Sequence, residues 1–200
     1  MMMFKPESLR RRFFANSAMV TFIVMLVSVI GIDISYVDEL EVSTRERLRL
    51  NVFNILSVAQ TNGNKIDIPA IVQNPKFNTD ASGLWAAVLD ENKRVVWQSL
   101  SIEQVPLNLP LSEQVGEWYF ASEQAESKPY ITLSYKISWK ESQLDSNFYF
   151  VVAEDRQFFQ ATVNSFRLWL LGGFITITLI LLLSQFLVLR YAFKPILVLE

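Results

Sequence analysis

Two apolar runs free of charged residues, 13–32 and 168–189, bracket this chain of 200 residues. A helix rises ~1.5 Å per residue, so about twenty apolar residues are needed to cross a hydrocarbon core ~30 Å thick. Each Asp, Lys or Arg at the bilayer centre would cost about 2.5–3.5 kcal/mol, and neither run contains one. The alternative is a pair of buried core helices, for which about 10–14 apolar residues would be more usual. We therefore expect two transmembrane helices.

The charges that flank the two runs predict the orientation of the chain. Residues 33–167 hold 12 Lys and Arg against 18 Asp and Glu, a net charge of −6, whereas the rest of the chain carries +4. Because cytoplasmic flanks are enriched in Lys and Arg, we expect both termini in the cytoplasm and residues 33–167 outside. The expected parts are a basic N-terminus (residues 1–12), a transmembrane helix (13–32), an outer domain (33–167), a second transmembrane helix (168–189) and an inner segment (190–200).

The outer domain reads as α+β. Apolar residues at three- and four-residue steps predict a helix over residues 37–60, and no Gly or Pro separates it from the first transmembrane helix. After Gly83 the period changes to two, which predicts strands. With no cysteine, the domain must be stabilised by its core alone. We expect a central antiparallel sheet with strands at residues 84–89, 94–97, 117–121, 130–139 and 148–153.

Catalytic chemistry is missing from the sequence. The chain has no His and no Cys, which excludes Ser-His-Asp and Cys-His catalysis and the usual zinc ligand sets. Its six glycines form no G-x-G-x-x-G or Walker motif that could hold a phosphate. We expect no enzymatic activity, no resident cofactor and no nucleic-acid partner for the chain as given.

Two sets of polar residues are candidates for a role in signalling or binding. Glu117, Glu123 and Glu126 form a sparse acidic stretch, which suggests a divalent cation site, with an ordinary solvated face as the alternative. Asn16 and Gln185 lie about one turn from the inner membrane edge. Since an amide in hydrocarbon needs a partner, we expect both to face the interior of a helix bundle, with snorkelling to the headgroups as the alternative.

Three stretches resemble the input half of bacterial sensor histidine kinases. Residues 8–13, Ser-Leu-Arg-Arg-Arg-Phe, look like the entry into the first helix of such kinases. Residues 89–97, Leu-Asp-Glu-Asn-Lys-Arg-Val-Val-Trp, resemble a hairpin of PAS-like (PDC) periplasmic domains, in particular those of PhoQ-like kinases. Residues 190–196, which include Pro195, look like the opening of a HAMP linker, where proline suits the first turn of a helix.

The resemblance implies a two-component signalling module. It implies a homodimer in the bacterial inner membrane, with residues 33–167 in the periplasm and Pro195 passing the signal inward. The family's phosphoacceptor histidine, its ATP- and Mg-binding domain and its contact with a response regulator would lie beyond Glu200, so we expect the chain to be part of a longer kinase. Lys93 stands where the family has a turn glycine, so the hairpin is expected to be distorted or to use Asn92 for a positive φ.

Two other functions fit the same input half. One is a receptor with a different output, such as a chemotaxis transducer or a cyclic-dinucleotide synthase. The other is a membrane-anchored binding protein without an output. The sequence that follows Glu200 would separate these three functions.

The charge asymmetry leads to a topology prediction. A reporter enzyme fused after Gln60 or after Asn108 is expected to lie outside the cytoplasm, because both positions lie between the two apolar runs. A reporter that works only in the periplasm should be active at both positions, and one that works only in the cytoplasm should be inactive. Activity assays with a periplasm-specific and a cytoplasm-specific reporter test this. Cytoplasmic activity at both positions would contradict the two-helix topology.

Overall fold

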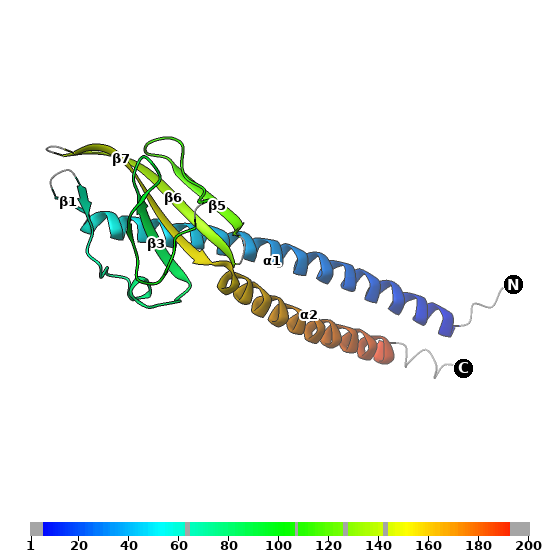
Figure 1. Ribbon diagram of the computed structural model, residues 1–200. Coiled ribbons are helices and arrows are strands. Elements are labelled where there is room, and N and C mark those ends of the chain that lie inside the picture. Colours follow the sequence, from blue (N-terminus) through cyan, green and yellow to red (C-terminus); the bar gives the residue numbers. More distant parts are fainter. Residues whose placement is uncertain (1–5, 63–64, 107, 126–127, 142–143, 193–200) are drawn as a thin grey trace. The chain divides into compact units, whose positions relative to one another are not determined.

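The computed structural model describes residues 6–62, 65–106, 108–125, 128–141 and 144–192 (Figure 1). Two long apolar helices precede and follow a five-stranded antiparallel sheet, which confirms an α+β fold. The elements in chain order are α1 (Pro6–Val58), β1 (Gln60–Asn62), β2 (Lys65–Asp67), the 3-10 helix η1 (Pro75–Asn78), β3 (Leu84–Leu89), β4 (Val95–Gln98), β5 (Trp118–Ala125), β6 (Lys128–Glu141), β7 (Leu144–Asp155) and α2 (Arg156–Ala192).

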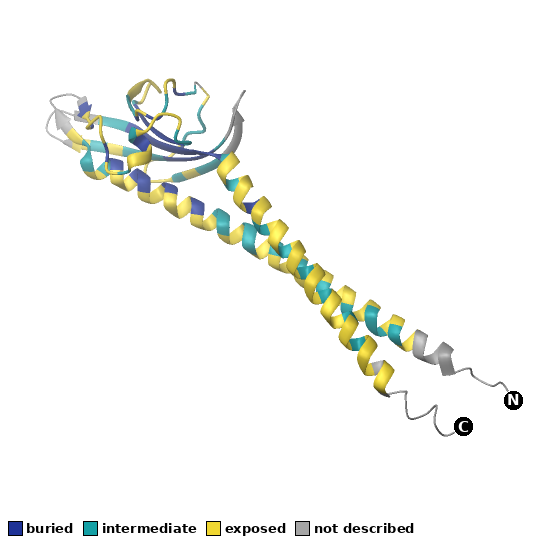
Figure 2. Cartoon of the chain, turned by 90° about the horizontal axis from the view of Figure 1, so that it is seen from below, coloured by how far each residue is buried: buried dark blue, intermediate teal, exposed yellow. Residues whose placement is uncertain are grey.

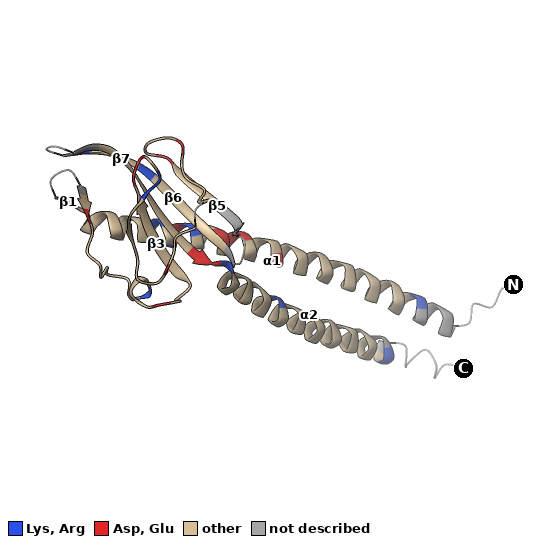
Figure 3. Cartoon of the chain, viewed as in Figure 1, with Lys and Arg blue, Asp and Glu red and all other residues tan. Residues whose placement is uncertain are grey.

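The chain divides into two compact units. One consists of residues 1–39 together with 162–200, and the other of residues 40–161. Within the described residues, α1 and α2 are both long enough and apolar enough to cross a membrane. Their charged residues lie toward the ends of the apolar stretches (Figure 3). The side chains along these stretches are exposed or half-buried (Figure 2).

The sheet has the strand order β4-β3-β7-β6-β5, with every neighbouring pair antiparallel. Its first and last strands in the sequence, β3 and β7, are therefore adjacent. All six residues of β3 are buried, since both faces of the sheet are covered there. A strand buried on both sides needs an unbroken apolar run, and Leu84–Leu89 supplies one.

The main core lies on the side of the sheet that faces the outer half of α1. Leu48, Val52 and Ile55 of α1 are buried at three- and four-residue steps. They pack with alternate residues of β3 and β7 and with Phe77 of η1. The continuous helix confirms that the predicted amphipathic segment extends the first apolar run.

A second, smaller core covers the other face of the sheet. Trp85 and Leu89 of β3 are buried there, together with Tyr149 and Val151 of β7. The segment between β4 and β5 covers them, and Val105 is its buried contribution. Because this second core buries the other face of β3, the strand does not alternate between apolar and polar residues.

The structure differs from the sequence-based expectation at three places. Strands β1 and β2 pair in a small hairpin that was not among the predicted strands. Strands β5, β6 and β7 are longer than the apolar pattern indicated, because polar residues continue the ladders beyond the core. In the β3–β4 turn the positive φ is at Lys93 (60°) and not at Asn92.

The β3–β4 turn is distorted, as its missing glycine predicted. The register shifts between Val88 and Leu89. Asp90 holds the turn by accepting the Arg94 amide on its carboxylate at 2.8 Å and the Lys93 amide on its carbonyl at 2.9 Å. The Glu91 carboxylate also accepts the Asn147 backbone amide of β7 at 3.0 Å. These side-chain bonds hold Lys93 in a left-handed conformation that a glycine would adopt more easily.

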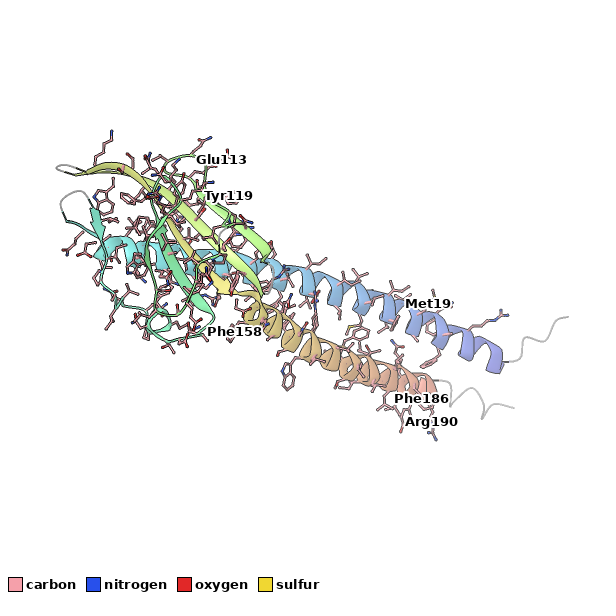
Figure 4. All side chains as sticks on the ribbon, viewed as in Figure 1. Met19, Glu113, Tyr119, Phe158, Phe186 and Arg190 are labelled. Atoms are coloured by element: carbon pink, nitrogen blue, oxygen red, sulfur yellow. The ribbon has the colours of Figure 1, made fainter. Side chains whose placement is uncertain are left out.

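Two glycines with the same backbone angle provide a matched test of packing. Gly83 has φ +80° and Gly116 has φ +83°. A Cβ at Gly83 would lie 2.5 Å from the Phe158 ring, whereas one at Gly116 would meet nothing within 4 Å. Phe158, labelled in Figure 4, belongs to the first turn of α2.

We predict that Gly116→Ala lowers the free energy of unfolding by about 1–2 kcal/mol, the cost of a left-handed alanine. Gly83→Ala should cost more, because the Phe158 ring must also move. Denaturant unfolding of the full chain in micelles, followed by tryptophan fluorescence, measures both values. Equal losses of unfolding free energy in the two variants would show that the Phe158 ring adds no cost to an alanine at position 83.

Candidate functional site

The end of β7 joins the sheet directly to α2. Asp155 is the last residue of β7, and Arg156 is the first of α2. The Asp155 carboxylate accepts the Gln157 backbone amide at 2.8 Å, which makes it the N-cap of the helix. The Asp155 backbone amide donates to the Gly83 carbonyl at 2.7 Å, so the start of β3 holds the same residue. A shift of β7 against β3 would therefore act directly on the first turn of α2.

An ion pair connects α1 to the same end of β7. The Arg47 guanidinium donates to the Glu154 carboxylate, whose side chain is only 10% exposed. Glu154 lies between Leu84 of β3 and Ile131 of β6 in the register of the sheet. Because a nearly buried carboxylate is costly without a partner, Arg47 fixes this turn of α1 beside β7.

Two arginines of α1 lie on aromatic rings of the edge strand β5. The Arg45 guanidinium carbon is 4.3 Å from the centre of the Phe120 ring, and that of Arg49 is 5.0 Å from the centre of the Trp118 ring. Trp118 in turn stacks on Tyr135 of β6 at 4.1 Å between ring centres. Cation–π contacts of this kind hold α1 to the edge of the sheet as Arg47 holds it to β7.

The second core contains one unpaired polar atom. Trp85 is 3% exposed, and its indole nitrogen has no hydrogen-bond partner among the described residues. The Tyr130 ring lies edge-on to it, 5.7 Å between centres. Burial raises the pKa of the Tyr130 hydroxyl, and the negative charge of Asp155 raises it further. This face of the sheet combines an apolar lining with a buried donor that has no partner among the described residues.

In the unit of residues 1–39 and 162–200, α1 and α2 are joined at the outer ends of the two apolar runs. The Arg167 guanidinium donates two hydrogen bonds to the Asp33 carboxylate, at 2.8 and 3.0 Å. One helical turn further along α1, Tyr36 stacks on Phe166 with 3.6 Å between ring centres. The paired guanidinium lowers the pKa of the Asp33 carboxyl and raises that of Arg167. These four residues are the outer clamp of the helix pair.

A second polar contact joins the helices inside the apolar runs. The Gln185 side-chain nitrogen donates to the Thr21 hydroxyl at 2.7 Å. The Gln185 side-chain oxygen and the Thr178 hydroxyl are buried and have no partner among the described residues. Gln185 thus lies between the two helices, but its partner is Thr21 and not Asn16, whose side chain is exposed. Its place in the interior of a helix bundle stays a prediction.

The acidic stretch is not assembled into a site by the described residues. Glu117 is exposed, and the side chains of Glu123 and Glu126 lie outside the described residues. Among the acidic side chains that are described, no three come together in an arrangement suited to a metal ion. The cation site stays a prediction, and so does the role of Pro195, which also lies outside the described residues.

Sequence reasoning missed the ion pairs Asp33–Arg167 and Arg47–Glu154. The Asp33–Arg167 pair could have been predicted, because Asp33 follows the first apolar run and Arg167 precedes the second. Antiparallel helices bring these outer ends to the same depth. The Arg47–Glu154 pair could not have been predicted, since the two residues are 107 positions apart and their contact depends on the register of the sheet.

Comparison of the chain with protein-family models, with curated proteins and with solved structures found no match.

The outer clamp gives a prediction for pH. Because pairing lowers the Asp33 pKa, its stabilisation is complete above the ordinary carboxyl pKa and is lost as pH falls through the lowered value. Arg167→Gln should move the Asp33 midpoint back up toward its ordinary value. Carbon NMR of labelled aspartate in the full chain in micelles measures this. An unchanged midpoint in Arg167→Gln would show that the ion pair does not form.

Proposed function

We propose that the chain is the extracytoplasmic signal-sensing and transmembrane signalling module of a two-component sensor histidine kinase. The observation that carries this proposal is the absence of a linker at either end of the sheet domain. The central strand β7 passes into α2 between Asp155 and Arg156, and α1 extends unbroken from the first apolar run into the core. A rearrangement of the sheet would therefore be felt by both apolar helices.

Membrane insertion is supported by the surfaces of the helices. The apolar stretches of α1 and α2 are covered by no other part of the described chain, and Leu168 and Trp169 are 72% and 84% exposed. Apolar surface of this extent is rare on a soluble monomer. Trp169 is the second residue of the second run and Tyr36 follows the first, as expected for aromatic anchors at a membrane surface. We place residues 33–167 in the periplasm of a bacterium and the two runs in its inner membrane.

A PAS-like domain is supported by the central antiparallel sheet. Its five strands have the order β4-β3-β7-β6-β5, and every neighbouring pair is antiparallel. The long α1 against one face and the β3–β4 hairpin over residues 84–98 fit the same comparison. The PAS-like (PDC) assignment is part of the proposal.

The contacts suggest how a signal would travel. A stimulus that shifts β7 relative to β3 acts on Asp155, which caps α2, and on Glu154, which holds Arg47 of α1. The two helices then change their relative placement in the membrane, and Pro195 starts the segment that receives the change. The output of this proposal is an ATP- and Mg-dependent kinase that acts on a response regulator as its partner.

A hybrid receptor tests the proposal. Residues 1–200 are fused to the cytoplasmic half of a sensor histidine kinase, and autophosphorylation is measured in membranes. One residue inserted after Val188 rotates the following helix by about 100°, whereas four residues leave its phase within about 40°. We expect the single insertion to change kinase activity several-fold and the four-residue insertion to restore most of it. Activity that is indifferent to both insertions would contradict coupling through α2.

A further inference from the structure

The two edges of the five-stranded sheet differ in how they are protected against another strand. β4 has only four residues, its register with β3 is shifted, and the exposed cations Lys93 and Arg94 precede it. Short length, irregular register and cationic side chains all hinder pairing with a further strand. β5 has eight residues without Lys, Pro or Gly, and its register with β6 is unbroken. Among the described residues only β6 pairs with β5, so its other edge is open.

Two exposed arginines of α1 lie over β5. Arg45 lies on the Phe120 ring and Arg49 on the Trp118 ring. Four residues of a helix rise about 6 Å and two residues of a strand rise about 6.8 Å, so successive turns of α1 meet successive rings on one face of β5. Both rings pack against the main core, on the face of the sheet that α1 covers. The two guanidinium groups are therefore held on that face, beside the open edge.

The two arginines differ in their charge balance. Arg45 forms an ion pair with Glu41, one turn earlier in α1. Arg49 lies 5.0 Å from the centre of the Trp118 ring and 5.8 Å from that of Phe53, and it forms no ion pair with a described carboxylate. A guanidinium that lies on aromatic rings keeps its planar fork of N–H donors available for a carboxylate. Arg49 is thus an oriented cation without an anion beside it.

We propose that an extended acidic segment of another protein adds to the sheet at β5. Its backbone continues the hydrogen-bonded ladder at a spacing of ~4.8 Å, and its alternate side chains lie on the face of α1. A carboxylate at the position beside Trp118 pairs with Arg49. On the opposite face an apolar side chain covers Tyr119, which is 47% exposed (Figure 4).

The sequence of β5 also indicates where the acidic residues of the partner belong. Glu123 is the only charged residue of the strand, and it lies five positions after Trp118. Like charges directly opposite each other destabilise a strand pair. The partner's carboxylates therefore belong at the Trp118 end of β5. The inference goes beyond the proposed function and depends on neither the membrane placement nor the kinase output, because all of its residues lie in the unit of residues 40–161.

A designed peptide tests the site. The probe has eight residues of alternating glutamate and valine, the length of β5, and carries a fluorescent label. Its binding to the full chain in uncharged micelles is measured by anisotropy. One control peptide replaces each glutamate with lysine. The other keeps the glutamates but has N-methyl groups on two adjacent central residues, which blocks both of its edges because successive N–H groups point in opposite directions. We expect the probe to bind several-fold more tightly than either control.

Variants of the chain separate charge from backbone pairing. Arg49→Gln should weaken binding of the probe about 1.4- to 5-fold, the range for an exposed ion pair, and Arg49→Lys should retain part of the loss. Arg94→Gln removes a matched exposed arginine beside β4 and should have no effect. Hydrogen exchange followed by mass spectrometry should show that the probe slows exchange in β5 and leaves β4 unchanged.

The possible results distinguish the parts of the proposal. No binding of the probe, equal binding of the N-methylated peptide, or slowed exchange in β4 alone would overturn strand addition at β5. Equal affinity of the glutamate and lysine peptides, or of Arg49→Gln and Arg94→Gln for the probe, would overturn the role of Arg49. Protection of β5 that rises with protein concentration without peptide would show that a second copy is the occupant and would overturn the acidic partner. Failure of the hybrid receptor leaves all of these results unaffected.

Discussion

The continuity of α1 is the constraint on which the rest of the structure depends. One helix of 53 residues has a first half that is apolar on all sides and a second half that is apolar on the face toward the sheet only. The change occurs after Ile32, where Asp33 pairs with Arg167, and it is complete at Thr44, the first buried position against the sheet domain. Because no loop interrupts the helix, one backbone belongs both to the apolar helix pair and to the hydrophobic core.

Several polar contacts lie where the helices meet other elements. Glu154 and Asp155 end β7, and each is engaged by a neighbouring element, Arg47 of α1 or Gly83 at the start of β3. At the helix pair, the outer clamp lies just beyond the apolar runs and the Gln185–Thr21 bond lies within them. A hydrogen bond between membrane helices contributes about 0.6 kcal/mol on average. A contact of that size does not by itself hold two helices together.

Much of this fold could be predicted from the sequence, because its dominant signals are local. The charge-free runs, the three- and four-residue steps of Leu48, Val52 and Ile55, and the alternation of β6 each depend on neighbouring residues. The β1–β2 hairpin could not be predicted, since its strands have three residues each and no apolar alternation. The positive φ of Lys93 depends on the bonds made by Asp90, and asparagine's general preference for that conformation misdirected the expectation to Asn92.

The candidate site was harder to predict than the fold. Gln185 and Asn16 were both expected in the interior of a helix bundle because they lie at similar depth, but depth does not determine which face of a helix a residue occupies. Counting 100° per residue places Asn16 opposite the face that holds Thr21. The Arg47–Glu154 pair depends on the strand register, which a single sequence does not specify. The acidic residues Glu117, Glu123 and Glu126 were chosen by proximity in sequence, and only Glu117 has a described side chain.

The most direct test of membrane insertion is a spin-label scan along α1 in lipid vesicles. Single labels from residue 18 to residue 57 are compared for collision with oxygen, which concentrates in lipid, and with a water-soluble nickel complex. Labels at Met19, Val24 and Leu26 should collide mainly with oxygen, labels at Val42 and Leu50 mainly with nickel, and labels at Leu48 and Val52 with neither. Nickel accessibility at Met19, Val24 and Leu26 as high as at Leu50 would contradict a transmembrane α1.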